Sequence, residues 1–200
     1  MTELKLFNKW SFQGIEIKDS GIKTYINLHP VVIPKSGGRF SKHPFYKSKM
    51  NIVERLINKL MVPGHRGKKH LLTSGRVTGQ TQTIIKIVKE VFEKLEKETK
   101  KNPLEVFVGA ICNAALREEI TSYQMGGIMV RKAVITSPQR RVDLALSVIT
   151  QSAYRKAFGK KMTMAEALFN EILYAYQNDA SKSEAIKEKE RIEREASGAR

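Results

Sequence analysis

The side chains whose number and spacing indicate a chemical function in this sequence are lysine and arginine. The 200 residues include 36 Lys and Arg against 20 Asp and Glu, which gives a net charge of +16. Two windows hold the surplus: residues 35–70 contain ten basic and one acidic residue, and residues 131–161 contain eight basic and one acidic residue. Positive charges in such excess repel one another in a compact monomer unless a bound polyanion offsets them. The two windows therefore predict two polyanion-binding surfaces.

The first window combines basic side chains with glycine, proline and aromatic residues. No helical period runs through residues 34–49, where Phe40, Phe45 and Tyr46 lie between the cations. This composition is typical of an arm that becomes ordered on a partner. The candidate polyanion contacts here are Lys35, Arg39, Lys42, His43, Lys47, Lys49, Arg55, Arg66, Lys68, Lys69 and His70.

The second window begins on a predicted strand and continues onto a predicted helix that starts at Pro138. Apolar residues recur at helical spacing from Val142 to Ala153, and a helical wheel puts Arg140, Arg141 and Arg155 on the opposite face. The arginine fork suits phosphate oxygens, and the first turn of a helix attracts anions through its free N–H groups. The candidates are Arg131, Lys132, Arg140, Arg141, Arg155, Lys156, Lys160 and Lys161.

Motifs for enzymatic or metal chemistry are not found in the sequence. The stretch 64–69 (GHRGKK) lacks both the spacing and the Ser or Thr of a phosphate-binding P-loop. The four histidines have no cysteines or nearby carboxylates that would complete a metal site. The adjacent carboxylates of Glu118 and Glu119 are not interpreted as a catalytic pair, because pairing with the neighbouring Arg117 explains them. The sequence thus predicts no catalytic residue, no metal and no cofactor.

The composition indicates the cellular compartment and the size of the fold. With 41% hydrophobic residues, the chain can bury the core of one domain. No apolar run is long enough to span a bilayer, and residues 1–25 contain no apolar stretch typical of a signal peptide. Cys112 is the only cysteine and is expected to be a buried, inert thiol, which suits a reducing cytosol. We expect a cytoplasmic protein with no membrane partner.

The pattern of apolar residues and caps predicts a mainly α-helical fold. We expect an extended basic N-terminal arm over residues 1–50 and a helical domain over residues 51–200. A β-hairpin at about 121–136, with a Gly-Gly turn, interrupts six helices between the third and the fourth. The helices are expected at 51–62, 81–100, 102–117, 138–158, 163–178 and from Ser181 onward, several of them opened by a cap or capping box.

Several of these segments together resemble a known family. Residues 51–61 and 67–69 resemble the signature of the universal small-subunit ribosomal protein seven, residues 102–108 its third helix, and residues 137–146 the opening of its fourth helix. The ending, residues 183–200, is similar to the archaeal and eukaryotic branch. The resemblance covers nearly the whole chain and includes the order of six helices and one ribbon.

The resemblance implies a structural role in translation rather than an enzymatic one. A member of this family is expected to bind the 3′ major domain of small-subunit rRNA, to nucleate assembly of the subunit head and to lie beside neighbouring ribosomal proteins, near the exit-site tRNA and the mRNA. It is not expected to be a homo-oligomer. The ribbon tip that would approach tRNA and mRNA comprises Met125, Gly126, Gly127 and Ile128.

Some positions depart from the family pattern. Leu116 replaces a proline at the end of the third helix, and the ribbon is altered around Met129 and Thr136. Residues 71–82 resemble an insertion. Two other classes also fit a basic helical protein: an architectural DNA-binding protein, which would bind duplex DNA as well as RNA, and an RNA-modifying enzyme, which would turn over an RNA substrate.

Overall fold

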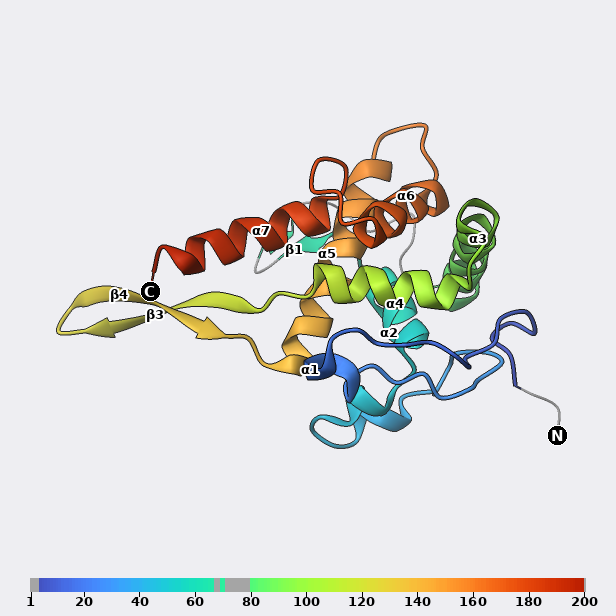
Figure 1. Ribbon diagram of the computed structural model, residues 1–200, viewed down its shortest axis with the longest axis horizontal. Helices are drawn as coiled ribbons and strands as arrows, with labels where there is room; N and C mark the ends of the chain where they lie inside the picture. Colours follow the sequence, from blue (N-terminus) through green and yellow to red (C-terminus); the bar gives the residue numbers. More distant parts are fainter. Residues whose placement is uncertain (1–3, 67–68, 71–79, 200) are drawn as a thin grey trace.

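The computed structural model of the chain describes residues 4–66, 69–70 and 80–199. A body of packed helices carries one long β-ribbon that projects from its side (Figure 1). The six expected helices are present, together with a short additional one. The described helices are α1 (Ser20–Lys23), α2 (Ile52–Leu60), α3 (Thr81–Thr99), α4 (Pro103–Ala114), α5 (Pro138–Ala157), α6 (Met164–Tyr176) and α7 (Glu184–Ser197).

The helix starts follow the capping residues in the sequence. Asn102 accepts a hydrogen bond from the backbone N–H of Leu104, and Thr163 forms a complete capping box with Glu166. The start of the last helix differs from the prediction. Ser183 caps it, because the Ser181 hydroxyl is bonded instead to the carboxylate of Asp179.

The core is centred on α6, which packs against α3, α4 and α5. Fully buried aliphatic and aromatic side chains, such as Phe92 and Phe107, fill the space between these helices. The approach of α4 to α6 is close enough to require glycine at position 109, since a Cβ atom there would lie 2.7 Å from the ring of Tyr176.

Residues 4–50 consist mainly of turns, bends and short helical segments, and they are attached to the helical body. Leu6, Trp10, Phe12 and Ile22 are buried in the common core. The Trp10 ring packs edge-on against Phe92 at 5.7 Å between ring centroids, and its N–H donates to Glu96. Two short 3-10 helices lie farther along this segment, η1 (Arg39–Ser41) and η2 (Tyr46–Lys49). Residues 4–50 therefore help to form the core that the helices share.

The ribbon consists of β3 (Glu118–Met125) and β4 (Ile128–Ile135), paired antiparallel from Glu118 opposite Ile135 to Met125 opposite Ile128. Gly126 and Gly127 form the predicted two-residue turn, with φ of 57° and 84°. The ribbon begins three residues before the predicted start at 121, because α4 already ends at Ala114.

A second, small antiparallel pair lies where the sequence predicted only a loop. It joins β1 (His65–Arg66) to β2 (Lys69–His70). Lys68, which was predicted to bind RNA, and most of the apparent insertion at 71–82 lie outside the described residues. Within the described part of the chain, no helix has the length and apolar character that crossing a membrane requires.

Candidate nucleic-acid interface

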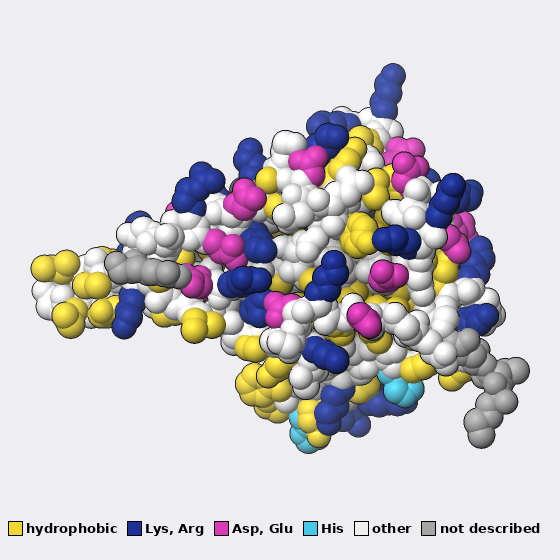
Figure 2. Space-filling model, viewed as in Figure 1, with side chains coloured by type: hydrophobic (Ala, Val, Ile, Leu, Met, Phe, Trp, Pro, Cys, Tyr) yellow, Lys and Arg dark blue, Asp and Glu magenta, His cyan; other side chains and the backbone are white. Residues whose placement is uncertain are grey.

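The first basic stretch forms an exposed surface along one edge of the body. Lysine, arginine and histidine side chains gather there in the space-filling view, over the segment that precedes α2 (Figure 2). Two of the predicted RNA-binding residues lie next to the Tyr46 ring. The Lys49 Nζ lies 3.9 Å from the centre of the ring, and the His43 ring centroid lies 4.8 Å from it. The exposed predicted contacts in this stretch are Lys35, Arg39, Lys42, His43 and Lys49.

A hollow of about 310 Å³ opens within this surface. Its lining includes the cations Lys35, Arg39 and Lys49 and the aromatic ring of Phe40. Glu54 also lines the hollow, but this carboxylate already accepts hydrogen bonds from the backbone and the hydroxyl of Ser36. Cations beside an aromatic face can take a phosphate and a base of the same nucleotide.

Arg55 does not belong to this surface, which corrects the expectation from sequence. Its side chain is 1% exposed, and its guanidinium donates to the carbonyl of Tyr25 at 2.8 Å and to Asp143 Oδ1 at 3.1 Å. Lys47 reaches the same Asp143 oxygen from the surface at 2.9 Å. Burial alone would raise the pKa of Asp143, but the hydrogen bonds and charges of Lys47 and Arg55 outweigh it and hold that pKa below its usual range.

The two arginines in the first turn of α5 are both engaged within the protein. Arg141 is buried, contrary to the helical-wheel prediction: it donates to the carbonyl of Leu116 at 2.8 Å and pairs with Asp19. Arg140 is more exposed, but it holds both carboxylate oxygens of Glu119 at 2.8 to 3.0 Å. Residues before α1 and after α4 cover this end of α5, so its first turn has a second buried face.

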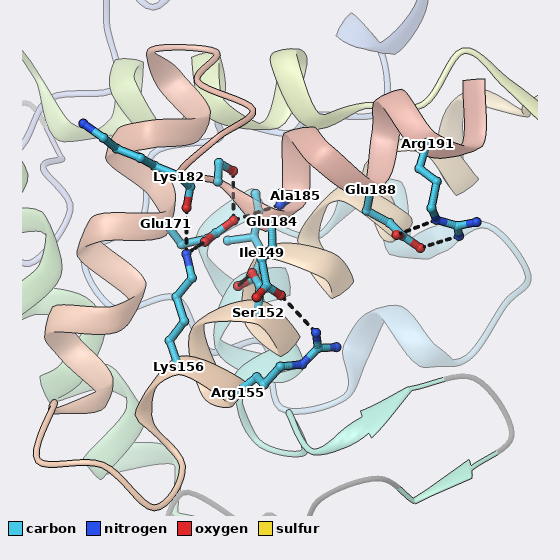
Figure 3. Close-up of polar contacts among 11 residues, drawn as sticks. Ile149, Ser152, Arg155, Lys156, Glu171, Lys182, Glu184, Ala185, Glu188 and Arg191 are labelled. Atoms are coloured by element: carbon cyan, nitrogen blue, oxygen red, sulfur yellow. Dashed lines mark hydrogen bonds and ion pairs between the residues drawn. The ribbon is translucent and has the colours of Figure 1, made fainter. Parts of the chain in front are cut away.

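At the end of α5, one cation is bonded within the protein and another points outward (Figure 3). Lys156 donates to Glu171 at 2.6 Å and to the carbonyl of Lys182 at 2.9 Å. Glu171 is fully buried and also accepts from the hydroxyl of Ser183, so Lys156 belongs to a network that joins α5, α6 and the start of α7. Arg155 points outward and meets Glu184 at 3.2 Å. Lys160 and Lys161, beyond the helix, are exposed.

The ribbon presents cations near its middle and apolar side chains at its end. Arg131 and Lys132 are exposed, and the described residues contain no carboxylate paired with either. At the tip, Met125 is 66% and Ile128 is 71% exposed, and these paired residues share one face of the ribbon. The hydrophobic colour at the far end of the projection in Figure 2 marks this tip.

Comparison of the chain with known proteins identifies its family. The family model described as ribosomal protein S7p/S5e matches residues 23–200. The chain belongs to this family. It is similar to the small ribosomal subunit protein uS7 of Nanoarchaeum equitans, 48% identical over 99% of this chain and 100% of that protein. The uS7 protein of Archaeoglobus fulgidus is 45% identical over 99% of this chain and 96% of its own length.

Membership of the S7p/S5e family confirms the expected structural class. The chain is a ribosomal protein of an archaeal type and not an enzyme, because the family is one of structural ribosomal constituents. The lone thiol fits this: Cys112 is half-buried, and burial raises the pKa of the thiol, which disfavours the reactive thiolate.

Two features of this S7-family chain were missed in the sequence. The projecting ribbon tip was predicted, but the apolar character of its exposed face was not. The two-residue alternation of Tyr123 and Met125 could have indicated one apolar face. Lys59 was counted in the first basic window but was not proposed as a contact, and it lies half-buried beside Lys47 and Arg55. Of Arg66, Lys69 and His70, only the backbone pairing is described.

Proposed function

We propose that this chain is a constituent of the small ribosomal subunit that binds the 3′ major domain of its rRNA directly. The observation that carries the proposal is the exposed basic edge before α2, where cations stand beside aromatic rings (Figure 2). Exposed Lys and Arg that are not neutralised by the protein release counterions from RNA on binding, which is the main source of affinity for a phosphate backbone.

The contacts proposed for rRNA are the predicted cations that remain at the surface, together with those whose side chains are not described. Arg55, Arg141 and Lys156 are left out because carboxylates and carbonyls inside the protein hold them. Arg140 stays in the proposal, since it is about half-exposed and could exchange Glu119 for a phosphate. The proposed set is Lys35, Arg39, Lys42, His43, Lys47, Lys49, Arg66, Lys68, Lys69, His70, Arg131, Lys132, Arg140, Arg155, Lys160 and Lys161.

The ribbon is proposed to reach toward the exit-site tRNA and the mRNA while the body binds rRNA. Support comes from its projection beyond the helices and from the exposure of its tip (Figure 1). A two-stranded ribbon is only marginally stable by itself, so one that extends away from the core serves a purpose outside it. Nucleation of the subunit head follows in this proposal from a body that binds several rRNA segments at once. Neighbouring ribosomal proteins complete its surroundings, without a second copy of this chain.

The proposal is tested by binding to a fragment of the 3′ major domain at several salt concentrations. If roughly six to ten phosphates are contacted, affinity falls by about 10³ to 10⁵ between 50 and 200 mM salt. Duplex DNA of equal length is the competitor, and it should displace the protein poorly. Salt-independent binding, or equal affinity for DNA, would contradict the proposal. In a lysate, the tagged full chain should sediment with the small subunit.

A further inference from the structure

Four charged side chains meet where η2, α2 and α5 come together. Lys47 of η2 and Arg55 of α2 both contact the same carboxylate oxygen of Asp143 on α5, at 2.9 and 3.1 Å. Lys59, one helical turn beyond Arg55, is half-buried at the edge of this group. Two cations therefore share one carboxylate, and the third, Lys59, lies beside them without an ion pair of its own among the described residues.

The positive charge of this cluster exceeds what the protein neutralises. Burial lowers the pKa of Lys59, and the positive charges of Lys47 and Arg55 lower it further. Among the described residues, Asp143 is the one anion whose charge raises that pKa. The Nε of Arg55 is also buried without a hydrogen-bond partner in the described part of the chain. A half-buried ammonium that two other cations repel lowers the stability of the folded protein. A bound anion from outside the protein would offset this cost.

A groove lies beside the cluster, between α2 and α5. It has a volume of about 320 Å³ and is lined by the helix residues Asn58, Lys59, Ser147, Thr150 and Gln151, with Val62 just beyond α2. The Asn58 amide on one wall and the Ser147 hydroxyl on the other are donors that suit phosphate and ribose oxygens, whereas the Thr150 hydroxyl already donates to the backbone carbonyl of Leu146. The groove is thus mostly polar, and Lys59 is the one charged residue among the described residues that line it.

We propose that Lys59, backed by Lys47 and Arg55 around Asp143, binds a phosphate of the RNA backbone in the groove between α2 and α5. This inference rests on the proposed function and adds a contact to it. Lys59 touches the phosphate. Arg55 is a positioning residue: it stays buried and fixes Asp143, which holds Lys47 at the mouth of the cluster. A phosphate adds the negative charge that Asp143 alone does not supply.

The test is Lys59→Met, which keeps the length of the side chain and removes its charge. Because the charge is repelled in the free protein, the variant should unfold at the same temperature or at a higher one. It should bind the 3′ major domain fragment more weakly, and the slope of log affinity against log salt should fall by about one. Unchanged affinity and slope would overturn the inference, and so would a lower unfolding temperature, which would make Lys59 a structural residue.

Two further variants serve as controls. One distinguishes the charge of Lys59 from the shape of its side chain, and the other distinguishes a specific site from the net charge of the protein. Lys59→Arg keeps the positive charge and should keep the salt slope, even if Lys59→Met fails to fold. Lys86→Met removes an exposed lysine from α3, where basic and acidic residues are balanced, and should leave both affinity and slope unchanged. A slope that falls equally in Lys59→Met and Lys86→Met would contradict a specific site.

The free protein offers an independent measurement. Inorganic phosphate should raise the unfolding temperature of the wild type more than chloride of equal ionic strength does, and this difference should shrink in Lys59→Met. An equal phosphate effect in both proteins would contradict the site. If the wild type binds rRNA with a steep salt dependence while Lys59→Met behaves like it, only this inference fails. If the wild type itself does not bind, the proposed function fails.

Discussion

Arg140 at the start of α5 holds the carboxylate of Glu119 in β3 through three hydrogen bonds of 2.8 to 3.0 Å. The pair joins the first turn of the helix to the base of the ribbon. On the other side, Glu193 of α7 accepts from the backbone N–H of Arg117, just before β3 begins. The ribbon is therefore braced from two helices, while its outer half is exposed (Figure 1).

Removing this brace should loosen the ribbon without unfolding the body. In Arg140→Ala, amide hydrogen exchange should accelerate near Glu119 and on the facing strand, where Val134 is its partner. The loss in global stability should be at most about 1 kcal/mol, because the ion pair is partly exposed to solvent. Glu119→Gln should produce the same pattern of exchange. Unchanged exchange in both variants would show that α7 alone positions the ribbon.

Arg141→Ala should destabilise the fold rather than act through RNA contacts alone. Truncation leaves Asp19 without its buried partner and the Leu116 carbonyl without a donor, a loss of about 3 kcal/mol in the free energy of unfolding. Urea unfolding measures this directly. The matched variant Arg39→Ala, on the exposed edge, should change stability by no more than about 0.5 kcal/mol but should weaken rRNA binding. The reverse pattern would mean that Arg141, and not Arg39, is the RNA contact.

Acid should destabilise the protein through Asp143. Its pKa in the folded chain lies below the ordinary 3.8, mainly because hydrogen bonds and charges from Lys47 and Arg55 overcome the effect of burial. A lowered carboxyl pKa contributes stability that is present above the ordinary pKa and is lost as the pH falls through the lower folded value. Unfolding temperatures measured from pH 6 to pH 2 should therefore fall less steeply in Asp143→Asn than in the wild type.

The control for this titration is Glu98→Gln, on the exposed side of α3, which should follow the wild-type curve. Asp143→Asn should also be less stable at neutral pH, because Arg55 and Lys47 would then share no carboxylate. Parallel acid curves for the wild type and Asp143→Asn would contradict this account of the pair.

The ribbon turn can be altered separately from the RNA-binding body. Replacing Gly126 and Gly127 with alanine forces two side-chain-bearing residues to positive φ, at about 1 to 2 kcal/mol each, and should distort only the tip. Affinity for the 3′ major domain fragment should change less than twofold, while crosslinks from the tip to exit-site tRNA or mRNA in assembled subunits should decrease. A large loss of fragment affinity would place the tip on the rRNA instead.

Local features of the sequence determined most of the secondary structure. The caps at Asn102 and Thr163, the periodicity of the helices between them and the Gly-Gly turn each depend on residues within a few positions, so they can be read along the chain. The surplus of positive charge and the motifs of the S7p/S5e family are also properties of the sequence alone.

The tertiary structure decided which cations face solvent. Arg141 pairs with Asp19 across 122 positions of sequence, and Arg55 with Asp143 across 88. Helical periodicity identifies one apolar stripe, but it does not show that an N-terminal segment covers a second face. Burial depends on contacts between distant segments, so only the folded chain separates the arginines that hold the protein together from the cations left for RNA.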